Sequence, residues 1–179
     1  MNLTNRLLPY SIVFLCAILE SKLVVDFYLR TNPDTGVQLN NLYSVLIYVI
    51  FSAWIIAIWF LLGLIPHLFA LVYDAKGSFS KLLPKIGYGF LPMLIGIAFC
   101  FNLFDKIILP DKVTLEFIKT NKIINTIGLI NRYTMYALIP WTIYCIYKNS
   151  GLSILKSSIC VILPFTTIYL LSNLLSNLI

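Results

Sequence analysis

The chain has 179 residues, of which 60% are hydrophobic and only 11% are charged. A soluble domain is typically about 45–50% apolar and about 25% charged, so the composition excludes most soluble enzymes, DNA-binding domains and disordered proteins. The net charge of +6 fits basic residues that flank membrane spans. No cluster of lysines and arginines with interleaved aromatic residues points to nucleic acid. The composition predicts an integral membrane protein whose main partner is the lipid bilayer.

Charged and turn-forming residues divide the sequence into five long apolar stretches. These stretches cover residues 7–29, 42–73, 86–104, 124–147 and 157–178. A bilayer core requires about 20 apolar residues in a helix, and backbone groups that face lipid must be paired within the segment. We therefore expect an all-α polytopic membrane protein, a bundle of five transmembrane helices that forms a single membrane domain over residues 1–179. Gly63 and Pro66 are expected to bend the second span near its end.

The connections are short and basic. With five spans, the N-terminal side collects six basic residues and the opposite side five: Arg6, Lys76, Lys81, Lys85, Lys148 and Lys156 against Arg30, Lys106, Lys112, Lys119 and Lys122. The positive-inside rule then favours a cytoplasmic N-terminus. In residues 105–123, Val113, Leu115 and Phe117 alternate with polar residues, while the neighbouring charges fit a helical face. We expect an interfacial segment there and leave its secondary structure open.

Four ionisable residues lie inside predicted spans: Glu20, Lys22, Asp26 and Arg132. Such a position costs roughly 2.5–3.5 kcal/mol on insertion scales, which makes each residue a candidate for function. Lys22 and Asp26 are four residues apart and are placed to pair on one helix face. Glu20 lies on another face and requires a partner on a different helix, for which Arg132 is the first candidate.

Asn125 and Asn131 extend this possible polar seam between helices. The favoured interpretation is structural, with polar side chains holding helices together. One alternative is a proton-linked or ion-linked site, and the other is that the first span begins and ends at different residues, which leaves Glu20 near the headgroups.

No catalytic or metal-binding constellation is visible in the sequence. The four cysteines are isolated in apolar stretches, where they serve as small packing residues. His67 is the single histidine, which argues against a zinc site; it is expected at the membrane interface. We therefore expect no metal, no cofactor and no catalytic residue.

The stretch that leads into the third span is the most distinctive. Gly77 and Phe79 precede a Gly-Tyr-x-x-x-Pro element formed by Gly87, Tyr88 and Pro92. These residues resemble the YIP family, named for Ypt/Rab-interacting proteins, whose members share a five-span domain. The resemblance implies a non-enzymatic membrane protein, and the short segment before the first span implies a compact, bacterial-type member. On physical grounds alone, Gly87 and Gly89 allow close helix approach, and Pro92 kinks the third span.

The sequence therefore leads to a functional expectation with two alternatives. We expect a YIP-type scaffold or accessory subunit that binds another membrane protein, or further copies of itself, in the bacterial inner membrane. One alternative is a small ion- or proton-linked transporter or channel that uses Glu20 and Arg132. The other is an integral membrane enzyme that acts on lipid, with His67 at the interface.

Overall fold

The computed structural model describes residues 3–31, 37–110 and 113–176. Within these ranges the chain is helical, with short connections and no strand, so the all-α class is confirmed. The elements are α1 (Leu3–Thr31), α2 (Val37–Val72), α3 (Phe79–Gly87), the 3₁₀ helix η1 (Tyr88–Phe90), α4 (Leu91–Phe104), α5 (Leu115–Thr120), α6 (Lys122–Ser150) and α7 (Ile154–Ser176). A helix therefore occupies each of the five apolar stretches.

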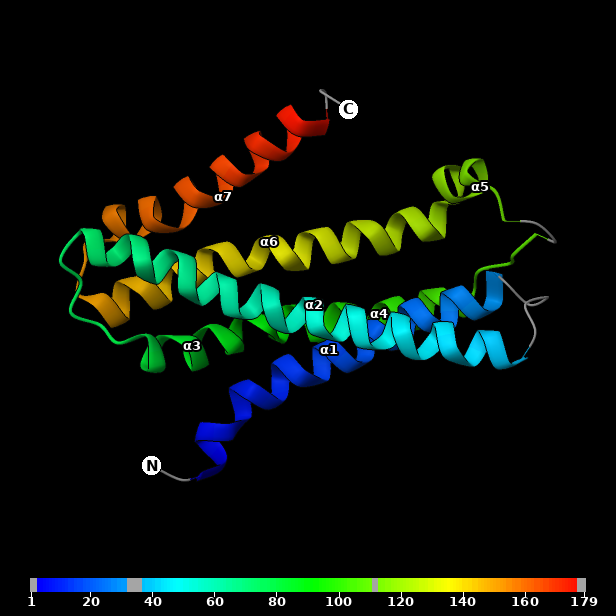
Figure 1. The fold of residues 1–179 in the computed structure, drawn as a ribbon, viewed down its shortest axis with the longest axis horizontal. Helices are drawn as coiled ribbons and strands as arrows, with labels where there is room; N and C mark the ends of the chain where they lie inside the picture. Colours follow the sequence, from blue (N-terminus) through cyan, green and yellow to red (C-terminus); the bar gives the residue numbers. More distant parts are fainter. Residues whose placement is uncertain (1–2, 32–36, 111–112, 177–179) are drawn as a thin grey trace.

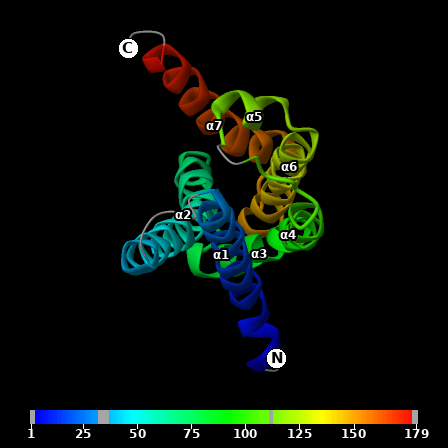
Figure 2. The ribbon, with the colours of Figure 1, turned by 90° about the vertical axis from the view of Figure 1, so that its right-hand side faces the viewer.

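The long helices form an elongated bundle (Figure 1). Helices α2, α4 and α6 run along its length, and α1 crosses them obliquely while packing on α2 and α4. The α2–α3 and α6–α7 connections share one end, whereas α5 lies at the other end (Figure 1). Helix α7 contacts α6 and α2 near its start and then diverges from the bundle, as both Figure 1 and Figure 2 show.

Two helical stretches of the described chain are long and apolar enough to cross a membrane. They are Asn41–Val72, within α2, and Phe79–Phe104, which joins α3, η1 and α4. A shorter apolar stretch, Ile154–Thr167, forms the first part of α7. Helix α1 is less apolar because it contains Glu20, Lys22 and Asp26.

The core is built where the helices converge near the start of α1. Apolar side chains from α1, α2, α3, η1, α4, α6 and α7 fill it, including Val13, Cys16, Leu62, Ile86, Phe90, Ile97, Leu138, Ile146 and Val161. Many other apolar side chains of α2 point outward, among them Leu42, Val45, Val49 and Trp54. A helix that is apolar on all sides is suited to a protein core or to lipid rather than to water, and the outward side chains of α2 fit lipid.

The structure describes two segments that the sequence alone left uncertain. Helix α2 continues through Pro66 to Val72, so the expected bend at Gly63 and Pro66 does not end this helix. In the connection after α4, the Thr114 hydroxyl accepts a hydrogen bond of 3.1 Å from the Phe117 amide, which caps α5. Asn121 caps α6 in the same way, and these two caps favour helix over strand in this segment.

Candidate functional site

Glu20 is the centre of a polar cluster that joins three helices. Its Oε1 atom, on α1, accepts a hydrogen bond of 2.9 Å from Asn131 Nδ2, on α6. The side-chain Oδ1 atom of Asn131 in turn accepts a hydrogen bond of 3.6 Å from the Cys100 thiol, on α4. The other carboxylate oxygen, Oε2, is buried and has no hydrogen-bond partner among the described residues. The cluster therefore leaves one strong acceptor unsatisfied inside the bundle.

The expected ion pairs of this region are not formed. Over the described residues, the structure has one ion pair, which joins Arg30 to Asp105 at 2.9 Å. Asn131, rather than Arg132, reaches Glu20 because consecutive residues of a helix point about 100° apart, and the Arg132 side chain is exposed.

Lys22 and Asp26 do not pair with each other either. The Lys22 ammonium lies 6.0 Å from the centre of the Phe101 ring on α4, within the range of a cation–π contact. Asp26 is half-buried further along α1. Among the described residues, Glu20 is therefore the one of the four predicted intramembrane positions that a hydrogen bond joins to a distant helix.

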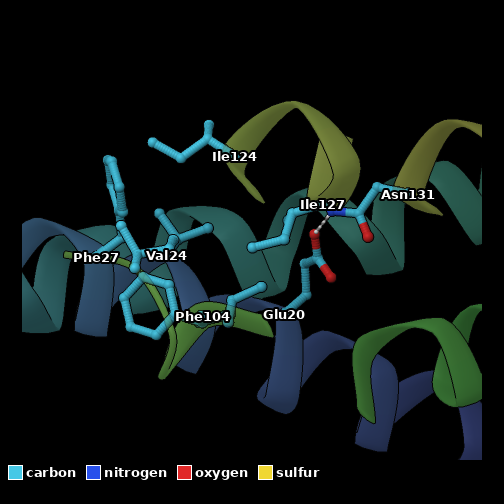
Figure 3. Close-up of a pocket in the computed structure, with 9 residues that line it drawn as sticks. Glu20, Val24, Phe27, Phe104, Ile124, Ile127 and Asn131 are labelled. Atoms are coloured by element: carbon cyan, nitrogen blue, oxygen red, sulfur yellow. Dashed lines mark hydrogen bonds between the residues drawn. The ribbon is translucent and has the colours of Figure 1, made fainter. Parts of the chain in front are cut away.

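Glu20 lines two pockets. The first has a volume of about 200 Å³ and is bounded by Leu23, Val24, Phe27, Phe104, Ile107, Ile124, Ile127 and Asn131 in addition to Glu20. Figure 3 shows the Glu20 carboxylate and the Asn131 amide together at one end, with apolar side chains over the remainder. The second pocket, of about 280 Å³, is bounded by residues of α2, α4 and α6, and both Glu20 and Asn131 line it too.

A second polar contact holds α1 to α2 one residue after Glu20. The hydroxyls of Ser21 and Ser52 lie 2.9 Å apart, and Ser21 also donates to the Ala17 carbonyl at 2.7 Å. These are the interhelical side-chain hydrogen bonds that commonly join helices in membranes. The polar seam thus has a structural part, Ser21 with Ser52, beside the incompletely satisfied Glu20.

The motif glycines lie at close helix contacts. A Cβ atom added to Gly87 would lie 2.7 Å from the Pro9 carbonyl oxygen, so only glycine allows α1 to approach α3 at this point. A Cβ atom at Gly77 would collide with the Asn149 carbonyl at the end of α6. Tyr88 is half-buried against the core, and Pro92 lies in the first turn of α4, directly after η1. A turn of 3₁₀ helix therefore separates α3 from α4 just before Pro92.

Phe79 and His67 form an aromatic contact at the α2–α3 end of the bundle. Their ring centres lie 5.7 Å apart, and Phe79 also packs edge-on against Phe60 at 5.6 Å. No group of three His, Cys, Asp or Glu side chains that is suited to a metal ion occurs among the described residues. An integral membrane enzyme that acts on lipid would require a reactive group beside His67. The contact that the structure gives His67 is with the aromatic ring of Phe79.

Two tryptophans have a role that sequence reasoning missed. Trp59 Nε1 donates to the Leu83 carbonyl at 3.1 Å, and Trp141 Nε1 donates to the Lys85 carbonyl at 2.9 Å. The Lys85 carbonyl lies in the last turn of α3, where helix carbonyls lack their full set of intrahelical donors. Helix α3 is thereby clamped between α2 and α6.

Comparison with known proteins adds no assignment. The chain matches no protein-family model, no curated protein and no solved structure.

Proposed function

We propose that the chain is an integral membrane protein in which five helices cross the bilayer. In addition to the two helices that are apolar enough to span a membrane, α1 and α6 each have 29 residues and α7 has 23. At 1.5 Å per residue, all three exceed the bilayer core of about 30 Å. The placement of connections at alternate ends of the bundle supports this topology (Figure 1).

We place the N-terminus in the cytoplasm of a bacterial cell, with the α2–α3 connection on the same side. Single cysteines at Lys76 and Lys106, introduced after replacement of the four native cysteines, test this orientation. An impermeant maleimide applied to intact spheroplasts is expected to label Lys106→Cys and to spare Lys76→Cys until the membrane is opened. The reverse pattern would refute the orientation, and labelling of both positions would refute the five-span topology.

Within the membrane, we propose that the protein acts without catalysis as a YIP-type scaffold or accessory subunit for another membrane protein. The observation that supports this proposal is the course of α7. After its contacts with α2 and α6, its later part extends clear of the bundle (Figure 2), and Lys156 is its single charged residue. A helix of this composition, free of its own bundle on most sides, offers a long apolar face to a neighbouring membrane protein.

Site-specific photocrosslinking in native membranes tests this proposal. A photoreactive residue at Leu163, which is exposed on α7, is expected to form one discrete adduct with a partner protein or a second copy. Ile95, exposed on α4, is the matched control and is expected to crosslink to lipid. Equal adducts from both positions, or none from Leu163, would contradict a partner on α7.

The Glu20 cluster favours a second candidate function, proton- or cation-linked transport. A carboxylate that lines two pockets is placed to pass a proton or cation between them. Flux through proteoliposomes is expected to disappear in Glu20→Gln and to persist in Glu116→Gln, which removes an exposed carboxylate of α5. Unchanged flux in Glu20→Gln would remove this candidate.

A further inference from the structure

The pocket beside Glu20 combines an almost wholly apolar lining with a single acidic group. Seven of its nine lining residues are Leu, Val, Ile or Phe, and the other two are Glu20 and Asn131. The acidic group and its amide partner lie at one end of the pocket, while Val24, Phe27 and Ile124 lie toward the other (Figure 3). The pocket thus has an apolar body and a polar end.

Among the described residues, no lysine or arginine forms an ion pair with Glu20 at this polar end. Lys22 lies 6.0 Å from the centre of the Phe101 ring, and Arg132, whose side chain is exposed, borders the second pocket rather than this one. Asn131 satisfies Oε1 with a hydrogen bond, but Oε2 is buried without a donor. An ionised carboxylate in apolar surroundings is strongly unfavourable unless a cation or further donors reach it. A ligand that carries its own ammonium group supplies both a charge and donors.

The size of the pocket limits the apolar part of such a ligand. An apolar cavity of about 150 Å³ accepts one benzene molecule, and this pocket has a volume of about 200 Å³. One ring with a short chain and an amine therefore fits, and a lipid with two acyl chains does not. Phe27 and Phe104, whose ring centres lie 6.1 Å apart, offer aromatic surface to that ring.

We propose that this pocket binds a small apolar amine, with its ammonium on the Glu20 carboxylate and its hydrocarbon part between α1, α4 and α6. This inference does not depend on the scaffold function. It concerns the same Glu20 site as the second candidate function, transport, and it names the class of ligand that binds there. Binding without flux would support the inference while removing that candidate.

Fluorine NMR of 4-fluorophenethylamine, added to the full chain in a mild detergent, tests the proposal at neutral pH. The resonance is expected to broaden and shift in a saturable way with the wild-type protein. Glu20→Gln keeps the size of the side chain and removes its charge, so the affinity is expected to fall at least tenfold. Glu116→Gln, the matched control on α5, is expected to bind as the wild type does.

Three competitors separate the roles of charge, hydrogen bonding and hydrophobic contact. Unlabelled phenethylamine is expected to displace the probe, whereas phenethyl alcohol and ethylbenzene, at equal concentration, are expected to displace it at least tenfold less effectively. Val24→Phe fills the apolar part and leaves the carboxylate in place, and it is expected to abolish binding even if Glu20→Gln fails to fold. Equal binding to Glu20→Gln or Val24→Phe, or equal displacement by ethylbenzene, would overturn the proposal.

Discussion

Asn131 on α6 donates a hydrogen bond of 2.9 Å to Glu20 on α1, although the two residues are 111 positions apart in the sequence. The same amide accepts from Cys100 on α4, so one asparagine side chain connects three helices. Its amide is the only hydrogen-bond donor to the Glu20 carboxylate among the described residues. The stability of the α1–α4–α6 contact therefore depends on an asparagine rather than on an ion pair.

Replacing Asn131 with leucine is expected to destabilise the protein by about 1–3 kcal/mol, because it leaves the Glu20 carboxylate without a donor in an apolar site. Thermal unfolding in detergent, followed by circular dichroism, measures this loss. The double variant Glu20→Leu/Asn131→Leu removes both polar groups and is expected to recover most of the stability. Asn102→Ala, an exposed position on α4, is the control and is expected to leave the melting temperature unchanged. A double variant that is less stable than the single variant would show that the hydrogen bond has little importance.

Substitution of Gly87 tests the close contact between α1 and α3. Gly87→Ala places a Cβ atom 2.7 Å from the Pro9 carbonyl oxygen and 3.1 Å from its Cβ. Because backbone cannot move aside as a side-chain tip does, we expect a loss of about 1–3 kcal/mol. Chemical unfolding of the detergent-solubilised protein measures this difference.

Gly128→Ala is the matched control within a helix. Nothing lies within 4 Å of the added Cβ atom, and alanine favours a helix over glycine by roughly 0.5–1 kcal/mol. This variant is therefore expected to be slightly stabilised. If Gly87→Ala and Gly128→Ala changed the stability equally, the α1–α3 contact would not require glycine.

Trp141→Phe tests the clamp on α3. The variant retains an aromatic ring but loses the 2.9 Å hydrogen bond from the indole to the Lys85 carbonyl, so we expect a loss of about 0.5–1.5 kcal/mol. The melting temperature in detergent reports it. Trp54→Phe is the control, because Trp54 is exposed on α2 and 61% of its surface is accessible. A larger effect at Trp54 than at Trp141 would contradict a clamp.

The positions of the helices follow from the sequence, whereas the partners of its polar residues do not. Long apolar stretches predict helices because lipid and core both exclude unpaired backbone, and a helix occupies every stretch expected. Contact between two helices also depends on their rotation about their axes, and a shift of one residue turns a side chain by about 100°. This is why Arg132 was the expected partner of Glu20 and Asn131 is the observed one.

Other features depend on contacts that no short motif specifies. The Trp141 hydrogen bond joins residues 56 positions apart, and it depends on the approach of α6 to α3. In contrast, the helical character of the α4–α6 connection depends on local caps at Thr114 and Asn121, and closer attention to those side chains would have predicted it. Helix caps can thus be predicted from the local sequence, whereas hydrogen bonds between distant helices can be identified only once the packing of the helices is known.

The contact between Arg30 and Asp105 gives the last prediction. The two groups lie 2.9 Å apart, but 43% and 74% of their side-chain surfaces are exposed, and exposed ion pairs contribute about 0–1 kcal/mol. Asp105→Asn is therefore expected to change the unfolding free energy by less than about 1 kcal/mol, and less still at high salt. Arg30→Ala is expected to be more destabilising, because the guanidinium also lies 4.3 Å from the centre of the Phe104 ring and donates to the Phe104 carbonyl at 3.3 Å. Unfolding of both variants at low and high salt compares the two contributions. Equal losses in the two variants would mean that Arg30 acts through the ion pair alone, and that its contacts with Phe104 do not stabilise the end of α4.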